Sequence, residues 1–152
     1  MTDEQLKYPI GKFSVPVTYT DSDIRGWIND IKVLPGKVRN TIMNLSETQL
    51  DTPYRPGGWT LRQVVHHLAD SHMNSIIRFK WAMTEEQPTI KAYKQSDWAL
   101  LADYRLPVEA SLKMLEGIHV HMVALFESFN EDDLSRTFTH PTTGRTAHSP
   151  RR

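Results

Sequence analysis

The chain has 152 residues, a length typical of one domain, and its 18 Lys and Arg residues balance its 18 Asp and Glu residues. It has no Cys, which excludes disulfides, thiolate metal sites and thiol nucleophiles, and it lacks the basic excess of a nucleic-acid-binding protein. The apolar runs are too short to span a membrane and the acidic N-terminus has no signal-peptide core, so we expect a cytoplasmic protein with no membrane partner.

The first predicted elements are an N-terminal arm and a long helix. Residues 1–20 are interrupted by proline and glycine, which predicts an irregular, extended arm lying on the body of the domain. A helix follows over residues 21–45, where apolar side chains recur at steps of one, three or four residues. We expect its N-cap at Asp21 or Ser22. Pro35 should kink this helix, because proline has no N–H and crowds the preceding turn.

The second helix, over residues 61–83, has the clearest predicted start. Thr60 and Gln63 have the spacing of a capping box, in which each side chain bonds to the backbone N–H of the other residue. Trp59 and Val64 lie at the two positions that form a hydrophobic staple around such a box. Local side chains alone therefore predict where this helix begins.

A polar connector over residues 84–105, with one turn around residues 98–101, leads to a third helix over residues 107–129. We expect Pro107 as the first residue of that helix, and a polar tail after Asn130. Three amphipathic helices and almost no strand signal predict an all-α bundle in a single domain, with no sheet of more than two strands. The wide apolar stripes carry histidines, which favours a four-helix bundle with a site inside it.

Seven histidines are the best candidates for metal ligation or acid–base chemistry in a chain without Cys. They are His66, His67, His72, His119, His121, His140 and His148. No two of them have the three- or four-residue spacing that lets one helix face chelate a metal, and side chains at other spacings point in different directions. Spacing alone therefore gives only a weak signal for a metal site.

The helical pattern separates the histidines further. His72 and His119 lie in the middle of apolar stripes, which favours core histidines that each make one hydrogen bond over metal ligands. His66 lies on the outer face of its helix, where we expect exposure to solvent, and Asp70 is a possible partner four residues along.

His67 differs from these because it lies in a polar strip that flanks the apolar stripe. Ser71, Asn74 and Arg78 follow it at helical spacing on the same face. Such a strip either faces water or lines a pocket beneath a neighbouring helix. The residues alone leave these two interpretations equally open.

Three segments carry the motifs of a known family. They are Leu-Lys-Tyr-Pro-Ile-Gly at residues 6–11, the run that includes Gly-Gly-Trp-Thr and His-Met-Asn within residues 49–74, and Phe-Thr-His-Pro at residues 138–141. With them the chain resembles the YfiT-like metal-dependent hydrolases of the DinB superfamily over nearly its whole length. The resemblance implies a four-helix bundle that forms a homodimer in the cytoplasm and acts on a small-molecule substrate.

The resemblance also implies a divalent metal, Zn²⁺ or Ni²⁺, held by three histidines with an open position for water. By its place in the motif, His67 is the ligand from the second helix, and the other two come from a His-x-x-x-His pair on the fourth helix. This chain has no such pair, and the family pattern is lost from Thr146 onward. We therefore expect a DinB-like bundle whose fourth helix is missing from this chain through truncation or a frameshift, unless His140 or a partner chain completes the site.

The function that follows is metal-dependent hydrolysis, in which a three-histidine site lowers the pKa of bound water to about 7. Loss of the fourth helix would impair this function in the present chain. Two alternatives stay open. One is a metal-dependent thiol transferase that uses bacillithiol at the same three histidines, and the other is an inactive helical remnant or a module that only dimerises. The sequence assigns no catalytic residue that would decide between them.

Overall fold

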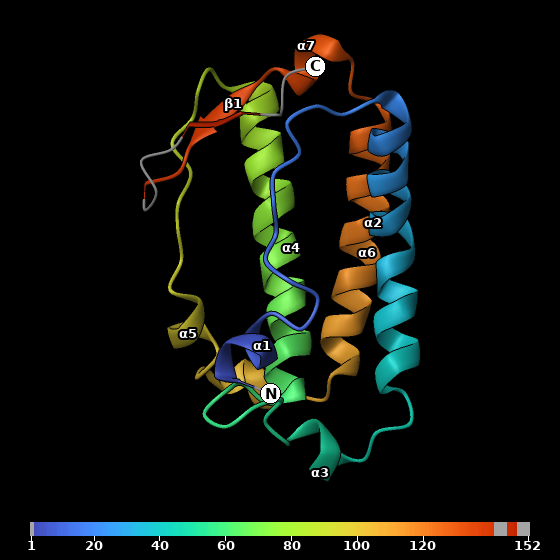
Figure 1. Cartoon of the computed structure of the whole chain (residues 1–152), viewed down its shortest axis with the longest axis vertical. Coiled ribbons are helices and arrows are strands. Elements are labelled where there is room, and N and C mark those ends of the chain that lie inside the picture. Colours follow the sequence, from blue (N-terminus) through green and yellow to red (C-terminus); the bar gives the residue numbers. More distant parts are fainter. Residues whose placement is uncertain (1, 142–145, 149–152) are drawn as a thin grey trace.

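Three long helices form the body of the protein in the computed structural model, which describes residues 2–141 and 146–148. They are α2 (Asp21–Ile42), α4 (Leu61–Thr84) and α6 (Glu109–Glu127). α6 packs along both of the others, whereas α4 stands apart from α2 (Figure 1). The all-α class and the three predicted helices are confirmed, and each helix ends within one turn of the predicted residue. Among the described helices, none combines the length and the apolar character needed to cross a membrane.

α4 begins where its capping box predicts. The Thr60 hydroxyl accepts a hydrogen bond from the Gln63 N–H at 3.1 Å, and the Gln63 side-chain oxygen accepts one from the Thr60 N–H at 2.9 Å. The side-chain amide of Gln63 also donates to the Ala99 carbonyl at 2.9 Å. The cap therefore fixes the start of α4 and ties it to the connector that follows this helix.

The start of α2 is set by Thr20, and not by Asp21 or Ser22 as predicted. The Asp23 carboxylate accepts from the Thr20 N–H at 2.7 Å, and the Thr20 hydroxyl accepts from the Asp23 N–H at 3.3 Å, which makes a reciprocal capping box. Asp21 and Ser22 are already helical, so neither has the extended conformation of a cap. Pro35 is buried inside α2, which continues through it, and the kink stays a prediction.

α6 begins at Glu109, later than predicted. Pro107 is not its first residue, because the Pro107 carbonyl accepts from the Ala110 N–H at 3.1 Å in the turn that precedes the helix. Val108 is the N-cap and makes no side-chain cap hydrogen bond. Its side chain packs against the core, so apolar packing positions this end of the helix.

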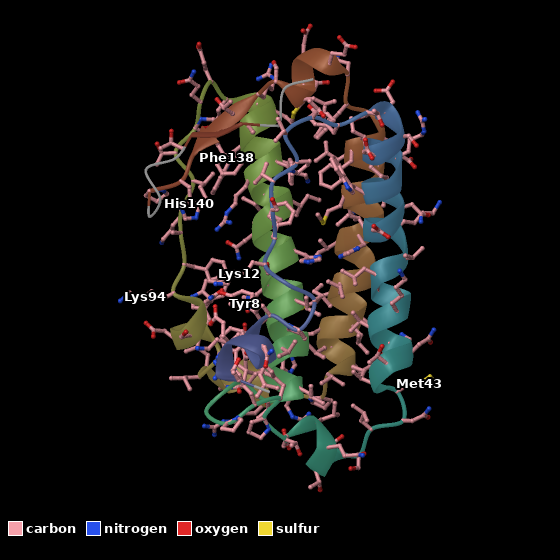
Figure 2. All side chains as sticks on the ribbon, in the orientation of Figure 1. Tyr8, Lys12, Met43, Lys94, Phe138 and His140 are labelled. Carbon is pink, nitrogen blue, oxygen red and sulfur yellow. The ribbon has the colours of Figure 1, made fainter. Side chains whose placement is uncertain are left out.

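The N-terminal arm is not wholly irregular, as was predicted, because Thr2 and Gln5 form a capping box at the start of α1 (Asp3–Lys7). After α1 the arm runs past α4 without regular structure (Figure 1). The Lys12 ammonium lies over the Tyr8 ring, 4.9 Å from its centroid (Figure 2). Three apolar side chains of this stretch are almost fully exposed: Ile10 at 99%, Phe13 at 87% and Val17 at 92%. The predicted packing of the arm on the body is therefore absent at these three residues.

The connector between α4 and α6 contains two short helices. α5 (Gln95–Trp98) and the 3₁₀ helix η1 (Ala102–Arg105) replace the single turn expected at residues 98–101. Figure 1 shows the connector running along α4 on the side away from α2. Because η1 contacts α4 and its Tyr104 is buried, the connector is anchored to the body of the domain.

The segment after α6 is not the polar tail that the sequence predicts. Asn130 caps a short helix, α7 (Glu131–Leu134). β1 (Thr137–Thr139) then pairs antiparallel with β2 (Thr146–His148) in a two-stranded ladder. Strands of three residues are too short for an alternating pattern to be read from the sequence. The ladder lies within the predicted limit of two strands.

A cluster of buried apolar side chains lies where α2 ends and where α4 and α6 begin. Its buried side chains come from these helices and from α3 (Glu47–Leu50), and they are Ile42, Leu50, Val65 and Leu112. Towards the other end of the helices, a cavity of about 390 Å³ is lined mainly by apolar side chains, including those of Trp27, Phe79 and Phe126. The first half of α4, which carries three histidines, is therefore held by the core.

Candidate functional site

The polar strip of α4 lies against Trp59, which precedes the N-cap of the helix, and against the connector. The His67 ring meets the Trp59 ring edge-on with 4.8 Å between centroids, and it lies 6.4 Å from the Tyr93 ring. His67 is half-buried as a result. The strip is therefore not fully exposed to water, and the segment that covers His67 is the connector and not the neighbouring helix of the second interpretation.

The imidazole of His67 has no hydrogen-bond partner in the described part of the chain. Its Nδ1 is buried without a hydrogen bond, and no bond to its Nε2 is found there either. Burial lowers the pKa of His67, and the nearby Asp70 charge opposes this shift. A neutral imidazole with an unused lone pair is a suitable metal ligand or proton acceptor.

Arg78 lies three turns further along the same strip. Its guanidinium carbon is 6.0 Å from the centroid of the Tyr93 ring, and one terminal nitrogen donates to the Lys91 carbonyl at 3.3 Å. Its Nε is buried without a hydrogen-bond partner among the described residues. His67 and Arg78 are therefore two members of one strip that both face Tyr93 and both hold an unsatisfied buried nitrogen.

Asp70 is held by residues other than His66. The Tyr104 hydroxyl donates to the Asp70 carboxylate at 2.6 Å, and the Asn74 side chain donates to the Asp70 backbone carbonyl at 2.9 Å. Burial and the bond to Asp70 raise the pKa of Tyr104 far above its usual range, so the phenol remains a donor. This bond fixes a negative charge on the turn of α4 next to His67.

His66 is buried, contrary to the predicted exposure, with 5% of its surface accessible. Its Nε2 bonds to the Leu106 carbonyl at 3.0 Å and its Nδ1 to the Ser111 hydroxyl at 2.6 Å. Because a carbonyl only accepts, Nε2 carries the hydrogen and Nδ1 accepts from Ser111. The prediction failed because η1 and the start of α6 return across this face of α4. With both ring nitrogens bonded, His66 is not available as a metal ligand.

His119 is a core histidine as predicted, with 2% of its surface accessible, whereas His72 is only half-buried, and the fold pairs the two residues. His72 Nδ1 lies 2.6 Å from His119 Nε2, and His119 Nδ1 donates to the Ile31 carbonyl of α2. Burial lowers the pKa of both imidazoles, that of His72 to about 4. Since the two residues are 47 positions apart in the chain, no spacing pattern predicts this pair.

The remaining histidines lie away from this pair. His121 is exposed on α6. His140 follows β1 beside the connector, where the Thr139 N–H donates to the Pro88 carbonyl at 2.9 Å (Figure 2). The side chain of His148 lies outside the described residues. Across residues 2–141 and 146–148, no three His, Asp or Glu side chains come together as a metal site.

Tyr93 is the candidate site residue that the sequence analysis missed. Besides facing His67 and Arg78, its ring packs on Trp98 of α5 with 4.4 Å between centroids. In the sequence it lies in a polar connector without periodicity. One signal there is that a second aromatic residue, Trp98, lies five positions further along.

Comparison with known proteins identifies close relatives. Residues 32–152 match the sequence profile of the DinB superfamily. A Bacillus mycoides protein named "Putative metal-dependent hydrolase BcerKBAB4_2443" is 53% identical over 143 residues, which cover 94% of this chain and 83% of that protein. A Bacillus cereus protein with the same description, BCAH820_2714, is 54% identical over 141 residues, which cover 93% of this chain and 82% of that protein.

A solved structure matches the fold. It is that of YfiT from Bacillus subtilis, described as "a probable metal-dependent hydrolase with an unusual four-helix bundle topology". The two structures superpose with a TM-score of 0.93 at 39% identity, over 96% of this chain and 84% of that chain. The helices of this chain are therefore arranged as in a DinB-like four-helix bundle.

Proposed function

This chain is a YfiT-like member of the DinB superfamily, and on that basis we propose that it catalyses hydrolysis with the help of a divalent metal. The names of its relatives support this reaction class. The observation that carries the proposal to this chain is the state of His67, a half-buried imidazole at the motif position with no hydrogen bond in the described residues. Such a side chain binds a metal without first giving up another partner.

The form we propose for the metal centre is a three-histidine site for Zn²⁺ or Ni²⁺. A metal held in this way supplies a bound water with a pKa of about 7. The described residues fit one ligand position, that of His67, and do not make up the complete set of three. The family resemblance assigns the other two positions to a His-x-x-x-His pair, a pattern that this sequence does not contain.

The fourth helix that would carry this pair has a suitable place in the fold. α4 and α2 stand apart (Figure 1), and the cavity of about 390 Å³ is lined by residues of both helices. Two of its apolar side chains remain partly exposed, Trp27 at 44% and Phe79 at 37%. A helix packed here would bury them and complete a four-helix bundle.

The proposed assembly is a homodimer that acts on a small molecule. The family resemblance is the main support for both points. The exposed apolar side chains of the arm, Ile10 and Phe13 among them, fit an interface between copies of the chain. Light scattering on the purified chain measures its oligomeric state directly.

Titration calorimetry with Zn²⁺ and with Ni²⁺ tests the role of His67. The two proteins compared are the 152-residue chain and the same chain extended by the C-terminal segment of the Bacillus mycoides relative. We expect weak binding by the first, since one imidazole is one ligand of three, and tight binding of one metal per chain by the second. In the extended protein His67→Ala should abolish tight binding, while the control His121→Ala, at an exposed histidine, should retain it.

Two results would contradict this proposal. Tight stoichiometric binding by the 152-residue chain would show that this chain or its partner completes the site without a fourth helix. Tight binding by the extended chain that survives His67→Ala would remove His67 from the ligand set.

A further inference from the structure

Arg78 carries a positive charge that no carboxylate neutralises within the described residues. Its guanidinium lies over the Tyr93 ring and makes one hydrogen bond, 3.3 Å long, to the Lys91 carbonyl. Its Nε is buried and has no partner there. The side chain is thus partly removed from water without the counter-charge that would offset this cost.

Two other arginines show how this fold accommodates a guanidinium that is not fully exposed. Arg39 forms ion pairs with Glu109 and Glu116 of α6, each at 2.8 Å. Arg62, which is 7% exposed, bonds to two carboxylates at α3 and just beyond it. A charge taken out of water and left unpaired is costly. Arg78 departs from the pattern of the other two, and an anion from outside the described residues would satisfy it.

A second observation points to the same place. In the described part of the chain, the buried side-chain nitrogens and oxygens without a partner are His67 Nδ1 and Arg78 Nε. Both belong to the polar strip of α4, and both side chains face Tyr93, at 6.4 Å and 6.0 Å from its ring centroid. Buried polar groups are normally hydrogen-bonded. The two exceptions therefore both lie against one ring, that of Tyr93.

We propose that Arg78 binds an oxyanion, a carboxylate or a phosphate, of the substrate whose reacting group lies at His67. The guanidinium is a planar fork whose adjacent N–H groups match the two oxygens of such an anion. The bond to Lys91 occupies one terminal nitrogen, which leaves Nε–H and further N–H groups for the ligand. The Tyr93 ring supports the cation through a cation–π contact.

A substrate whose oxyanion binds Arg78 is an anionic small molecule. This assignment rests on the proposed function, because it takes His67 as the place of reaction. The anion site itself needs no metal, so it is tested on the metal-free chain, and failure of the metal proposal would be seen in a different experiment.

The test follows the indole N–H signal of Trp98 in nitrogen–proton NMR spectra, since Trp98 packs on Tyr93 with 4.4 Å between centroids. Sodium acetate and inorganic phosphate are titrated separately into the 152-residue chain, with sodium chloride keeping the ionic strength constant. We expect a saturable shift with at least one probe. A stronger response to acetate would indicate that the anionic group of the substrate is a carboxylate. A stronger response to phosphate would indicate that it is a phosphate.

Three variants test whether Arg78 is the residue that binds the anion. Arg78→Met should weaken binding at least tenfold. Arg78→Lys, which keeps the charge but loses the planar fork, should weaken it several-fold. The matched control Arg39→Met, at an arginine already paired with two glutamates, should bind the probe like the original chain.

The proposal is overturned if neither anion gives a saturable shift in the original chain. It is also overturned if Arg78→Met is folded by circular dichroism and binds with unchanged affinity. Should Arg78→Met fail to fold, unchanged affinity in Arg78→Lys would overturn the role of the fork.

Discussion

His72 on α4 donates a hydrogen bond from its Nδ1 to the Nε2 of His119 on α6, over 2.6 Å. The direction of this bond follows from Ile31, whose backbone carbonyl can only accept, so the Nδ1 of His119 carries a hydrogen and its Nε2 is the acceptor. The two bonds join α4, α6 and α2 through a polar link between the helices. The arrangement requires a neutral His119 ring, because a protonated His119 would present a donor to the Nδ1–H of His72.

The stability of the protein should therefore fall in mildly acidic solution. Burial, together with the neighbouring histidines, lowers the pKa of His72 to about 4, and burial lowers the pKa of His119 as well. The unfolded chain, in which a histidine has a pKa near 6.5, then binds protons more readily than the folded chain as the pH falls below about 6.5. The free energy of unfolding should be highest above that pH and decrease towards pH 4. Urea unfolding at several pH values measures this.

Two variants distinguish the contribution of the histidine pair to the pH dependence of stability from the contributions of other titrating groups. His72→Phe should reduce the slope of stability against pH, because one of the groups that takes up a proton on unfolding is gone. It should also cost roughly 1–3 kcal/mol at pH 7.5, since His119 loses its partner. His121→Ala, at an exposed histidine of α6, is the matched control. An equal slope in His72→Phe and in the original chain would contradict this account.

Thr60→Ala should destabilise the protein by about 1 kcal/mol, because the Gln63 N–H loses its acceptor at the start of α4. Thr41→Ala is a suitable control, since Thr41 is exposed within α2 and its hydroxyl bonds only to the Lys37 carbonyl one turn earlier. Thermal or urea unfolding measures both variants. A loss at Thr41 as large as that at Thr60 would argue against a specific cap.

Tyr104→Phe should cost roughly 1.5–3 kcal/mol, the usual range for a hydrogen bond to a charged group. The ring that packs in the connector is kept, so the change removes only the hydroxyl that donates to Asp70. Tyr54→Phe, at a tyrosine that is 43% exposed, should change the free energy of unfolding by less than about 0.5 kcal/mol. Similar losses in the two variants would show that the bond to Asp70 adds little.

The parts of this structure that the sequence predicts are those decided by nearby residues. Thr60 and Gln63 are three positions apart, and their capping box locates the start of α4 correctly. The environment of His66 is decided by Leu106 and Ser111, which lie 40 and 45 positions away, and there the helical pattern alone predicts the wrong surface. A pattern within one helix shows which residues share a face, but not which later segment returns to cover it.

The same limit applies to the candidate site. Helical spacing correctly grouped His67 with Arg78 on one strip of α4, because that relationship is local. Tyr93 comes from a connector whose path depends on how η1 and β1 anchor to the body, so its position between the two could not be read from spacing. The three-residue strands likewise depend on a partner strand rather than on a pattern of their own.

Trp27 offers a direct test of where a fourth helix would pack. Its side chain is 44% exposed and lines the cavity of about 390 Å³. When the chain is extended by the C-terminal segment of the Bacillus mycoides relative, a helix in that space should bury Trp27, and the tryptophan fluorescence should shift to shorter wavelength. Trp27→Phe should remove most of this shift. Trp81→Phe, at a tryptophan of α4 that is 36% exposed and does not line the cavity, should leave it in place. Added helicity in the circular dichroism spectrum without a change in Trp27 emission would mean that the extra helix packs elsewhere, and the proposed place for the fourth helix would then be wrong.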